Sequence, residues 1–175
     1  MRARRIGVQI AEWVAAVGRE TTSGAFEVVD LKDWPLPMDD EPWVPAGGDY
    51  QFEHTRAWSR KIAAAPAFVF VTPQYNWGYP AALKNALDHL YAEWAGKPAM
   101  IVSYGGHGGG RCAEQLQQVF DGLHMIPIAT KTGLRLSREH IEASPGGIDP
   151  AAEFQDHLGD LRQAFGELAA AREAH

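Results

Sequence analysis

The sequence has little of what would cross-link the chain, anchor it in a membrane or attract polyanions. Its single cysteine, Cys112, excludes an internal disulfide and a thiolate metal cluster. No apolar run approaches the roughly 18 residues that cross a bilayer, and residues 1–20 lack the uninterrupted apolar stretch of a signal peptide. The formal net charge of −6 argues against a general nucleic-acid-binding protein. These absences predict a cytoplasmic protein with neither a membrane nor a nucleic acid as partner, and the length of 175 residues predicts a single domain over residues 1–175.

Extended and helical patterns alternate along the chain. Strands are expected at 26–31, 67–72, 98–104 and 125–130, and helices at 6–19, 50–64, from Pro80 onward, at 111–123 and at 150–172. Long loops are expected at 33–49 and 131–149, because both are rich in proline and glycine. Such alternation is typical of a parallel sheet covered by helices on both faces. Ligands of these sheets bind beyond the carboxyl ends of the strands.

The most specific segment, residues 72–88, reads TPQYNWGYPAALKNALD and joins an expected strand to an expected helix. It resembles the NADPH-dependent FMN reductase family, which includes quinone, azo and chromate reductases. In that family a strand ends in T-P-E-Y-N and is followed by P-x-x-L-K-N-A-[LI]-D. This chain departs from the pattern at Gln74, where the family has glutamate, and at 77–79, where the family has small residues. The spacing is intact.

The resemblance implies a fold and an activity. The fold is a flavodoxin-like, three-layer α/β/α doubly wound parallel sheet. The activity is that of an FMN-dependent oxidoreductase, with NADPH or NADH as hydride donor and a free flavin, a quinone or a similar small molecule as electron acceptor. No catalytic side chain is expected, because the flavin supplies the reactive atom. The family's members pair, which implies a homodimer or tetramer.

The resemblance also implies which residues contact FMN. Along the ring we expect Pro73, Gln74, Tyr75 and Asn76, whereas Trp77 is balanced between ring contact and core packing. Lys84 and Asn85 are expected to brace that loop. The glycine-rich turn after the strand at 98–104 is expected to back the ring through Gly105, Gly106, His107, Gly108 and Gly109. Glycine lets the backbone approach a ring where a Cβ would clash. His107 is either a donor to the ligand or a solvent-facing loop residue.

Two other interpretations of the glycine-rich turn are weaker. A dinucleotide fingerprint follows the first strand and has an acid about 20 residues later, and neither holds here. The turn also resembles the oxyanion loop of some esterases, but those enzymes need a G-x-S-x-G elbow, which this sequence does not contain.

The start of the chain differs from the family pattern. Family members open with a strand and then G-S-x-R-x-x-[RS]-x-G, a loop that wraps the FMN phosphate. Here Arg2 and Arg5 align with its two basic positions, while the strand and the glycine–serine pair are absent. That strand is interior in the strand order 2-1-3-4-5, and losing about five buried side chains removes on the order of 10 kcal/mol. We therefore expect the native product to start upstream of Met1 and this domain to be N-terminally incomplete.

The remaining candidates predict no further chemistry. The histidines show no pair at metal-binding spacing on one helix face, so no metal site is expected. Cys112 follows a glycine loop at a helix start, where a thiolate is favoured, but without a partner residue a buried structural cysteine is the better interpretation. A second functional hypothesis is a non-catalytic flavodoxin-like module that has lost FMN and acts by protein pairing.

Overall fold

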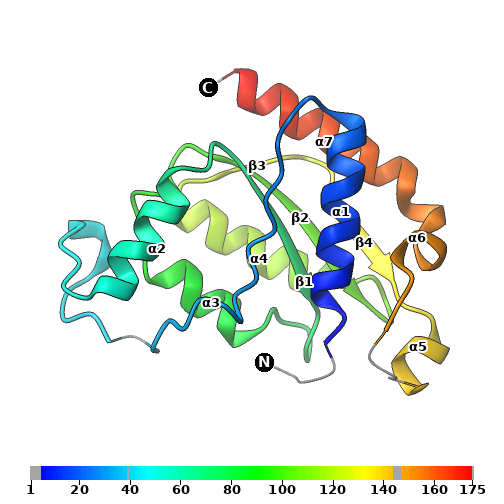
Figure 1. Ribbon diagram of the computed structural model, residues 1–175, viewed down its shortest axis with the longest axis horizontal. Helices are drawn as coiled ribbons and strands as arrows, with labels where there is room; N and C mark the ends of the chain where they lie inside the picture. Colours follow the sequence, from blue (N-terminus) through cyan, green and yellow to red (C-terminus); the bar gives the residue numbers. More distant parts are fainter. Residues whose placement is uncertain (1–4, 39, 144–146, 175) are drawn as a thin grey trace.

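The computed structural model describes residues 5–38, 40–143 and 147–174, and its parallel sheet lies between helices (Figure 1). The strands are β1 (Phe68–Pro73), β2 (Pro98–Gly105), β3 (Ile126–Pro127) and β4 (Thr132–Arg135). The helices are α1 (Gly7–Thr21), α2 (Glu53–Ala63), α3 (Ala81–Asp88), α4 (Gly110–Gly122), α5 (Arg138–Ala143), α6 (Pro150–Glu153) and α7 (Leu158–Glu173), with 3₁₀ turns at Pro45–Gly47 and Gln155–His157. Among these, no helix is both long and apolar enough to span a membrane.

The sheet is built around β2. β2 pairs in parallel with the whole of β1, from Phe68 opposite Ala99 to Pro73 opposite Tyr104. On its other side β2 pairs first with β3 and then with β4, also in parallel. All strands therefore end at one edge of the sheet, as the alternating pattern predicts.

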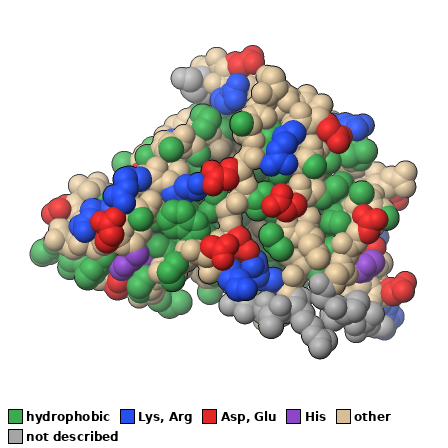
Figure 2. Space-filling model, viewed as in Figure 1, with side chains coloured by type: hydrophobic (Ala, Val, Ile, Leu, Met, Phe, Trp, Pro, Cys, Tyr) green, Lys and Arg blue, Asp and Glu red, His purple; other side chains and the backbone are tan. Residues whose placement is uncertain are grey.

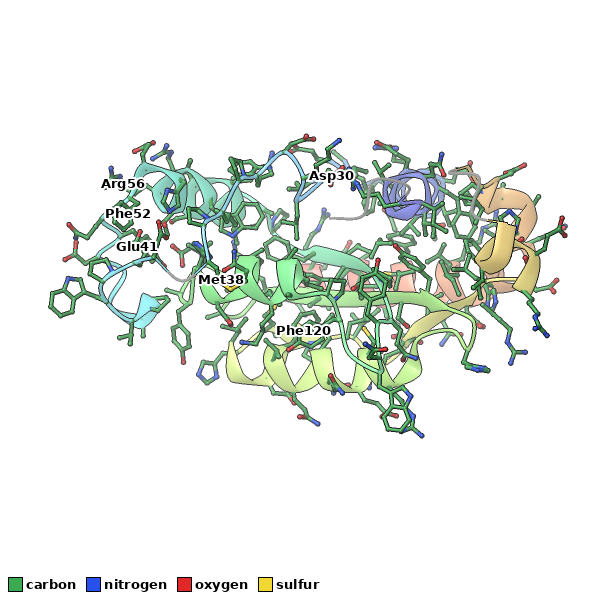
Figure 3. The ribbon with its side chains drawn as sticks, turned by 90° about the horizontal axis from the view of Figure 1, so that it is seen from below. Asp30, Met38, Glu41, Phe52, Arg56 and Phe120 are labelled. Atoms are coloured by element: carbon green, nitrogen blue, oxygen red, sulfur yellow. The ribbon has the colours of Figure 1, made fainter. Side chains whose placement is uncertain are left out.

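The buried side chains form one cluster on each face of the sheet. Met100 and Val102 of β2 pack with α1 and α7, whereas Ala99 and Ile101 pack with α3 and α4. Figure 3 shows α1 and α4 on opposite sides of the sheet. On the second face, α2 joins α3 through the buried Trp58, whose Nε1–H donates to the Ala86 carbonyl oxygen at 2.8 Å. The predicted three-layer arrangement is confirmed.

The prediction of a strand at 26–31 is wrong. This segment is extended but makes no ladder with any described strand. Its contacts are with helices instead: Phe26 packs edge-on against Phe165 of α7 at 5.3 Å, and Glu27 pairs with Lys61 of α2. A groove of about 770 Å³ lies between this segment and β1, lined by apolar side chains such as Val14 and Val69. An extended segment becomes a strand only when a neighbouring strand lies about 4.8 Å away. Here the groove separates the segment from β1, so no described strand lies at that distance.

The C-terminal third differs from expectation in three places. Of the strand predicted at 125–130 only Ile126–Pro127 pairs, and the segment predicted as a loop at 131–149 contains both the strand β4 and the helix α5. The helix predicted at 150–172 is broken into α6, a 3₁₀ turn and α7. β4 is only four residues long, and its sequence, TGLR, lacks a continuous apolar run, so its pairing with β2 depends on tertiary contacts.

Candidate functional site

Three segments meet at the edge where the strands end. β1 and β2 end opposite one another, and the N–H of Gln74 donates to the Tyr104 carbonyl oxygen at 2.9 Å, which holds the two following loops together. α1 begins beside them: a Cβ added at Gly7 would lie 2.8 Å from the Tyr104 hydroxyl. The start of α1, the loop after β1 and the turn after β2 are therefore neighbours, as expected for a ligand site of an open α/β sheet.

The loop after β1 closes as a tight hairpin. The N–H of Tyr75 donates to the Gly78 carbonyl oxygen at 2.8 Å, and the N–H of Gly78 donates back to Tyr75 at 2.9 Å. The two residues between them, Asn76 and Trp77, have φ of 47° and 73°. This is the pattern of a type I′ turn, which glycine and asparagine occupy far more readily than tryptophan. Such strain at a non-glycine residue is characteristic of functional sites.

The side chains of this hairpin point outward. Tyr75 is 37% exposed and Trp77 is 59% exposed, so Trp77 is not a core residue. The Trp77 ring lies over the Arg111 guanidinium, 3.8 Å from its carbon to the ring centre. Two aromatic surfaces and a cation are therefore displayed together at the sheet edge. The sequence interpretation missed Arg111, although it follows the glycine-rich turn directly.

Gln74 does not turn its side chain toward this surface. Its Oε1 accepts the Cys112 N–H at 3.1 Å and so binds a free donor in the first turn of α4. Cys112 itself is fully buried, with its Sγ 3.7 Å from the Pro73 carbonyl oxygen. Burial raises the pKa of the Cys112 thiol to about 11. Gln74 thus braces the loop rather than lining it, and the buried structural interpretation of Cys112 agrees with this environment.

The glycine-rich turn divides into two parts. Gly108 and Gly109 are buried with φ of 73° and 76°, and a Cβ on Gly109 would lie 2.8 Å from the Cβ of Ser103. These two glycines are needed to pack the turn onto the sheet. Gly106 and His107 are exposed at the rim, while Gly105 is half-buried. Of the five turn residues expected at the ligand, Gly106 and His107 are the ones that the structure leaves accessible.

The segment expected to bind the FMN phosphate is only partly described by the structure. Arg2 lies outside the described residues. Arg5 forms a two-point ion pair with Asp30, at 2.8 Å for Nη1 to Oδ1, and this guanidinium holds the pKa of the Asp30 carboxyl below its usual range. Arg5 is therefore engaged by a carboxylate. Among the described residues, no side chain caps the first turn of α1, a 15-residue helix, and that turn contains no acid, so its N–H groups suit an anion.

The two residues expected to brace the hairpin have other contacts. Lys84 pairs with Asp88 one turn later on α3. The Asn85 amide donates to the carbonyl oxygens of Leu36 and Pro37, at 3.1 and 3.3 Å. Asn85 is thus a brace, but for the loop that precedes α2.

Comparison with known proteins agrees with this geometry. The model of the NADPH-dependent FMN reductase family matches residues 1–134. An NAD(P)H-dependent FMN reductase of Schizosaccharomyces pombe is 56% identical over 171 residues, covering 97% of this chain and 84% of the relative. A quinone reductase of Pseudomonas putida is 32% identical over 158 residues, covering 82% and 75%. Among solved structures, the flavoenzyme NAD(P)H:(acceptor) oxidoreductase FerB of Paracoccus denitrificans superimposes with a TM-score of 0.70 at 18% identity, covering 98% and 93%.

Proposed function

The chain belongs to the NADPH-dependent FMN reductase family, and we propose that it binds FMN at the carboxyl edge of its sheet and reduces a quinone-like acceptor with NADPH or NADH. The observation that carries the proposal is the meeting of three features at this edge. They are the uncapped start of α1, the strained hairpin at 75–78 and the exposed turn at Gly106 and His107. Bound FMN would supply the redox chemistry, and the protein would supply position and charge.

The residues present suit the parts of FMN. A flat, apolar ring system with a polar rim needs aromatic or apolar contacts and backbone hydrogen-bonding groups without obstructing side chains. Tyr75 and Trp77 offer the first, and the accessible backbone of Gly106 and His107 offers the second. A phosphate suits the free N–H groups of α1 and the positive end of the helix dipole.

Charge at the edge favours an electron-rich ligand. Arg111 is held against Trp77 beside the hairpin, and His107 lies on the adjacent turn. A fixed cation near a ring that gains electrons lowers the energy of the reduced form. Arg111 is therefore a candidate for tuning the bound cofactor, and His107 is a candidate donor to the cofactor or the acceptor.

A quinone is the acceptor class that the relatives support, since one of them is a quinone reductase. The alternative of a non-catalytic module that has lost FMN is not favoured, because the matched family and the relatives are enzymes. We also propose a cytoplasmic location, supported by the single free cysteine.

Pairing of two copies is part of the proposal. The loop before α2 exposes Met38, Trp43 and Val44 at 76%, 69% and 76%, and Phe52 is also exposed. Figure 2 shows hydrophobic side chains gathered at this end of the molecule. Apolar groups concentrated on one loop mark an interaction surface. Light scattering of the protein as it elutes from a size-exclusion column gives its molar mass, which distinguishes a homodimer from a tetramer or a monomer. The measurement is made on the unchanged chain and on Trp43→Glu.

We further propose that the groove beside β1 accommodates one more parallel strand of this domain. That strand would precede α1 in the chain. The outer edge of β1 has no partner among the described residues, and the groove walls are apolar. The helices α3 and α4 each follow a strand that ends at the carboxyl edge of the sheet, and α1 also begins at that edge. A strand running parallel to β1 would lead into α1 at that edge, as β1 leads into α3 and β2 into α4.

The function is tested with purified, tag-free protein. FMN titration should quench flavin fluorescence with saturation, and NADPH should then drive reduction of a soluble quinone. His107→Ala and Trp77→Ala should weaken FMN binding or quinone turnover by several-fold, whereas Gln118→Ala, on the exposed face of α4, should not. A folded protein that neither binds FMN at micromolar concentration nor consumes NADPH would overturn the proposal.

A further inference from the structure

We propose that Asp40, His54 and His89 form a binding site for a divalent transition-metal ion of the zinc class. The three residues come from separate places in the fold: Asp40 from the loop before α2, His54 from the first turn of α2, and His89 from the position directly after α3. One ligand atom from each lies within 4.8 Å of the others. The site is distinct from the proposed flavin edge, because it joins the loop at 36–52 to α2 and α3.

The strongest observation is the state of His89. Its side chain is 3% exposed, and its Nδ1 lies 2.7 Å from the Asn85 carbonyl oxygen. A carbonyl oxygen only accepts, so Nδ1 must carry the proton. In a neutral ring Nε2 then presents a lone pair. That atom is buried, has no hydrogen-bond partner among the described residues, and lies 3.9 Å from a carboxylate oxygen of Asp40.

The buried His89 Nε2 thus faces a second acceptor, the partly exposed Asp40 carboxylate, and a cation between them removes this conflict. Burial leaves an unsatisfied polar group costly, so a native protein is expected to satisfy this one. A metal ion is suited to it, because a ligating histidine characteristically donates its other ring N–H to a carbonyl or carboxylate. The His89–Asn85 contact has this arrangement.

The distances suit a small ion with imidazole and carboxylate ligands. Zinc bonds of about 2.0–2.1 Å in a tetrahedron place ligand atoms about 3.3 Å apart. Here Asp40 Oδ1 lies 3.1 Å from His54 Nε2 and 3.9 Å from His89 Nε2, and the three ligand atoms all lie within 4.8 Å of one another. The contact of His54 with Asp40 is a hydrogen bond, so a bound ion would replace the proton between them, and side-chain rotation would bring the atoms onto one ion. Three protein ligands leave a fourth position for water or for a group from another molecule.

The surrounding contacts hold the ligands in place. The Asn85 side chain donates to Leu36 and Pro37, so one residue orients His89 through its backbone and the Asp40 loop through its amide. His54 stacks on Phe52 with ring centres 5.5 Å apart. Glu41 accepts the Phe52 N–H at 3.1 Å and thereby ties the loop to the start of α2. Figure 3 shows Glu41 and Phe52 together beside α2, at the end of the molecule away from Asp30.

A bound ion would therefore cross-link the loop that displays Trp43 and Val44 to the body of the domain. The site could not be found from the sequence, because His54 is on α2, His89 directly follows α3 and Asp40 is in a loop. Short spacing motifs detect ligands that lie close together in the sequence.

The test uses tag-free protein dialysed against a chelator and then against metal-free buffer. Titration with zinc chloride, followed by calorimetry and by elemental analysis after desalting, should give one ion per chain. Cobalt(II) as a probe should give the visible absorption of a four-coordinate N/O site. Asp40→Asn and His54→Gln, at partly exposed positions, should each weaken zinc binding at least about tenfold. His140→Gln is the matched control, since it breaks a histidine–carboxylate pair elsewhere, between His140 and Glu153 at 2.9 Å.

Two results of the binding experiments would overturn the proposal. One is the absence of stoichiometric zinc at tens of micromolar metal in protein that is folded by circular dichroism. The other is binding that Asp40→Asn and His54→Gln leave unchanged, which would place the ion elsewhere. Nitrogen NMR of the His89 ring gives a second readout: a neutral ring that shifts on zinc addition supports the site, whereas a ring protonated on both nitrogens near neutral pH and unmoved by zinc means that a proton fills this role.

Discussion

The side chain of Gln74 caps the helix that begins near Cys112: its Oε1 accepts the Cys112 N–H at 3.1 Å. At the same time the Gln74 N–H donates to Tyr104. One residue therefore ties the loop after β1 to both β2 and α4. The hairpin at 75–78, which displays Tyr75 and Trp77, is oriented by this contact.

Removing that cap should destabilise the domain and loosen the hairpin. Gln74→Ala is expected to lower the free energy of unfolding by about 1 kcal/mol, since loss of a capping acceptor typically costs about 0.5–2 kcal/mol. FMN affinity should fall with it. Gln74→Glu should retain stability, because a carboxylate also accepts the bond and is favoured at a helix start. Urea unfolding and FMN titration measure both effects. A Gln74→Ala protein as stable as Gln118→Ala would contradict the role of the cap.

Trp77 should prove more important for activity than for stability. Its left-handed backbone costs roughly 1–2 kcal/mol for an L-residue, while its ring over Arg111 returns only about 0.5–1 kcal/mol. Trp77→Gly should therefore leave the melting temperature unchanged or raise it, and should lower kcat/KM for quinone several-fold. Trp77→Phe, which keeps an aromatic ring, should retain most of the activity. Loss of stability together with full activity in Trp77→Gly would show that the residue serves folding instead.

The ion pair of Arg5 with Asp30 predicts a defined pH dependence. Because Arg5 lowers the pKa of Asp30 in the folded state, the pair stabilises fully above the ordinary aspartate pKa of 3.8 and is lost as pH falls through the lower, folded value. Asp30→Asn should cost about 1–2 kcal/mol at pH 7, as expected for a charge-assisted pair. This difference from the unchanged chain should shrink below about pH 4. Urea titrations at pH 7, 5 and 3.5 follow it, and a difference that is constant with pH would refute the assignment.

Cys112 should resist thiol reagents in the folded protein. Complete burial and a pKa raised to about 11 leave on the order of one thiolate in a thousand at pH 8. Ellman's reagent should label the native chain over hours and the urea-unfolded chain within minutes, with one equivalent in the latter. Fast labelling of native protein would mean that the start of α4 opens readily.

Filling the groove beside β1 should stabilise the domain. A fused N-terminal segment with five consecutive Val and Ile residues, leading into α1, should raise the urea midpoint, because each buried side chain contributes about 1.5–3 kcal/mol before the cost of ordering the strand. The amides on the outer edge of β1 should then exchange more slowly with solvent. The matched control carries Asp at the second and fourth of the five positions. Equal stability of the two fusions would argue that the groove does not receive a strand.

The local sequence is enough to predict some of the helices and strands but not others. The strands β1 and β2 and the helices α3 and α4 form close to the expected positions, because each pattern is long and either wholly apolar or regularly spaced. Residues 26–31 have an equally good strand pattern and form no strand, since a strand also requires a partner. The short β4 forms without a pattern, because β2 provides one.

In the candidate flavin site, too, some features follow from the local sequence and others from tertiary contacts. Residues 72–88 and the glycine-rich turn were identified because the order of their residues resembles the pattern of the FMN reductase family. What each side chain does there was decided by tertiary contacts: Gln74 turns to α4, Arg5 turns to Asp30, and Asn85 holds the loop at Leu36. The sequence by itself determined the central strands, the helices beside them and the edge of the sheet at which we propose that FMN binds. Only the tertiary structure decided which side chains reach that edge, and it alone brought Asp40, His54 and His89 together, because contacts between distant segments depend on how the elements pack.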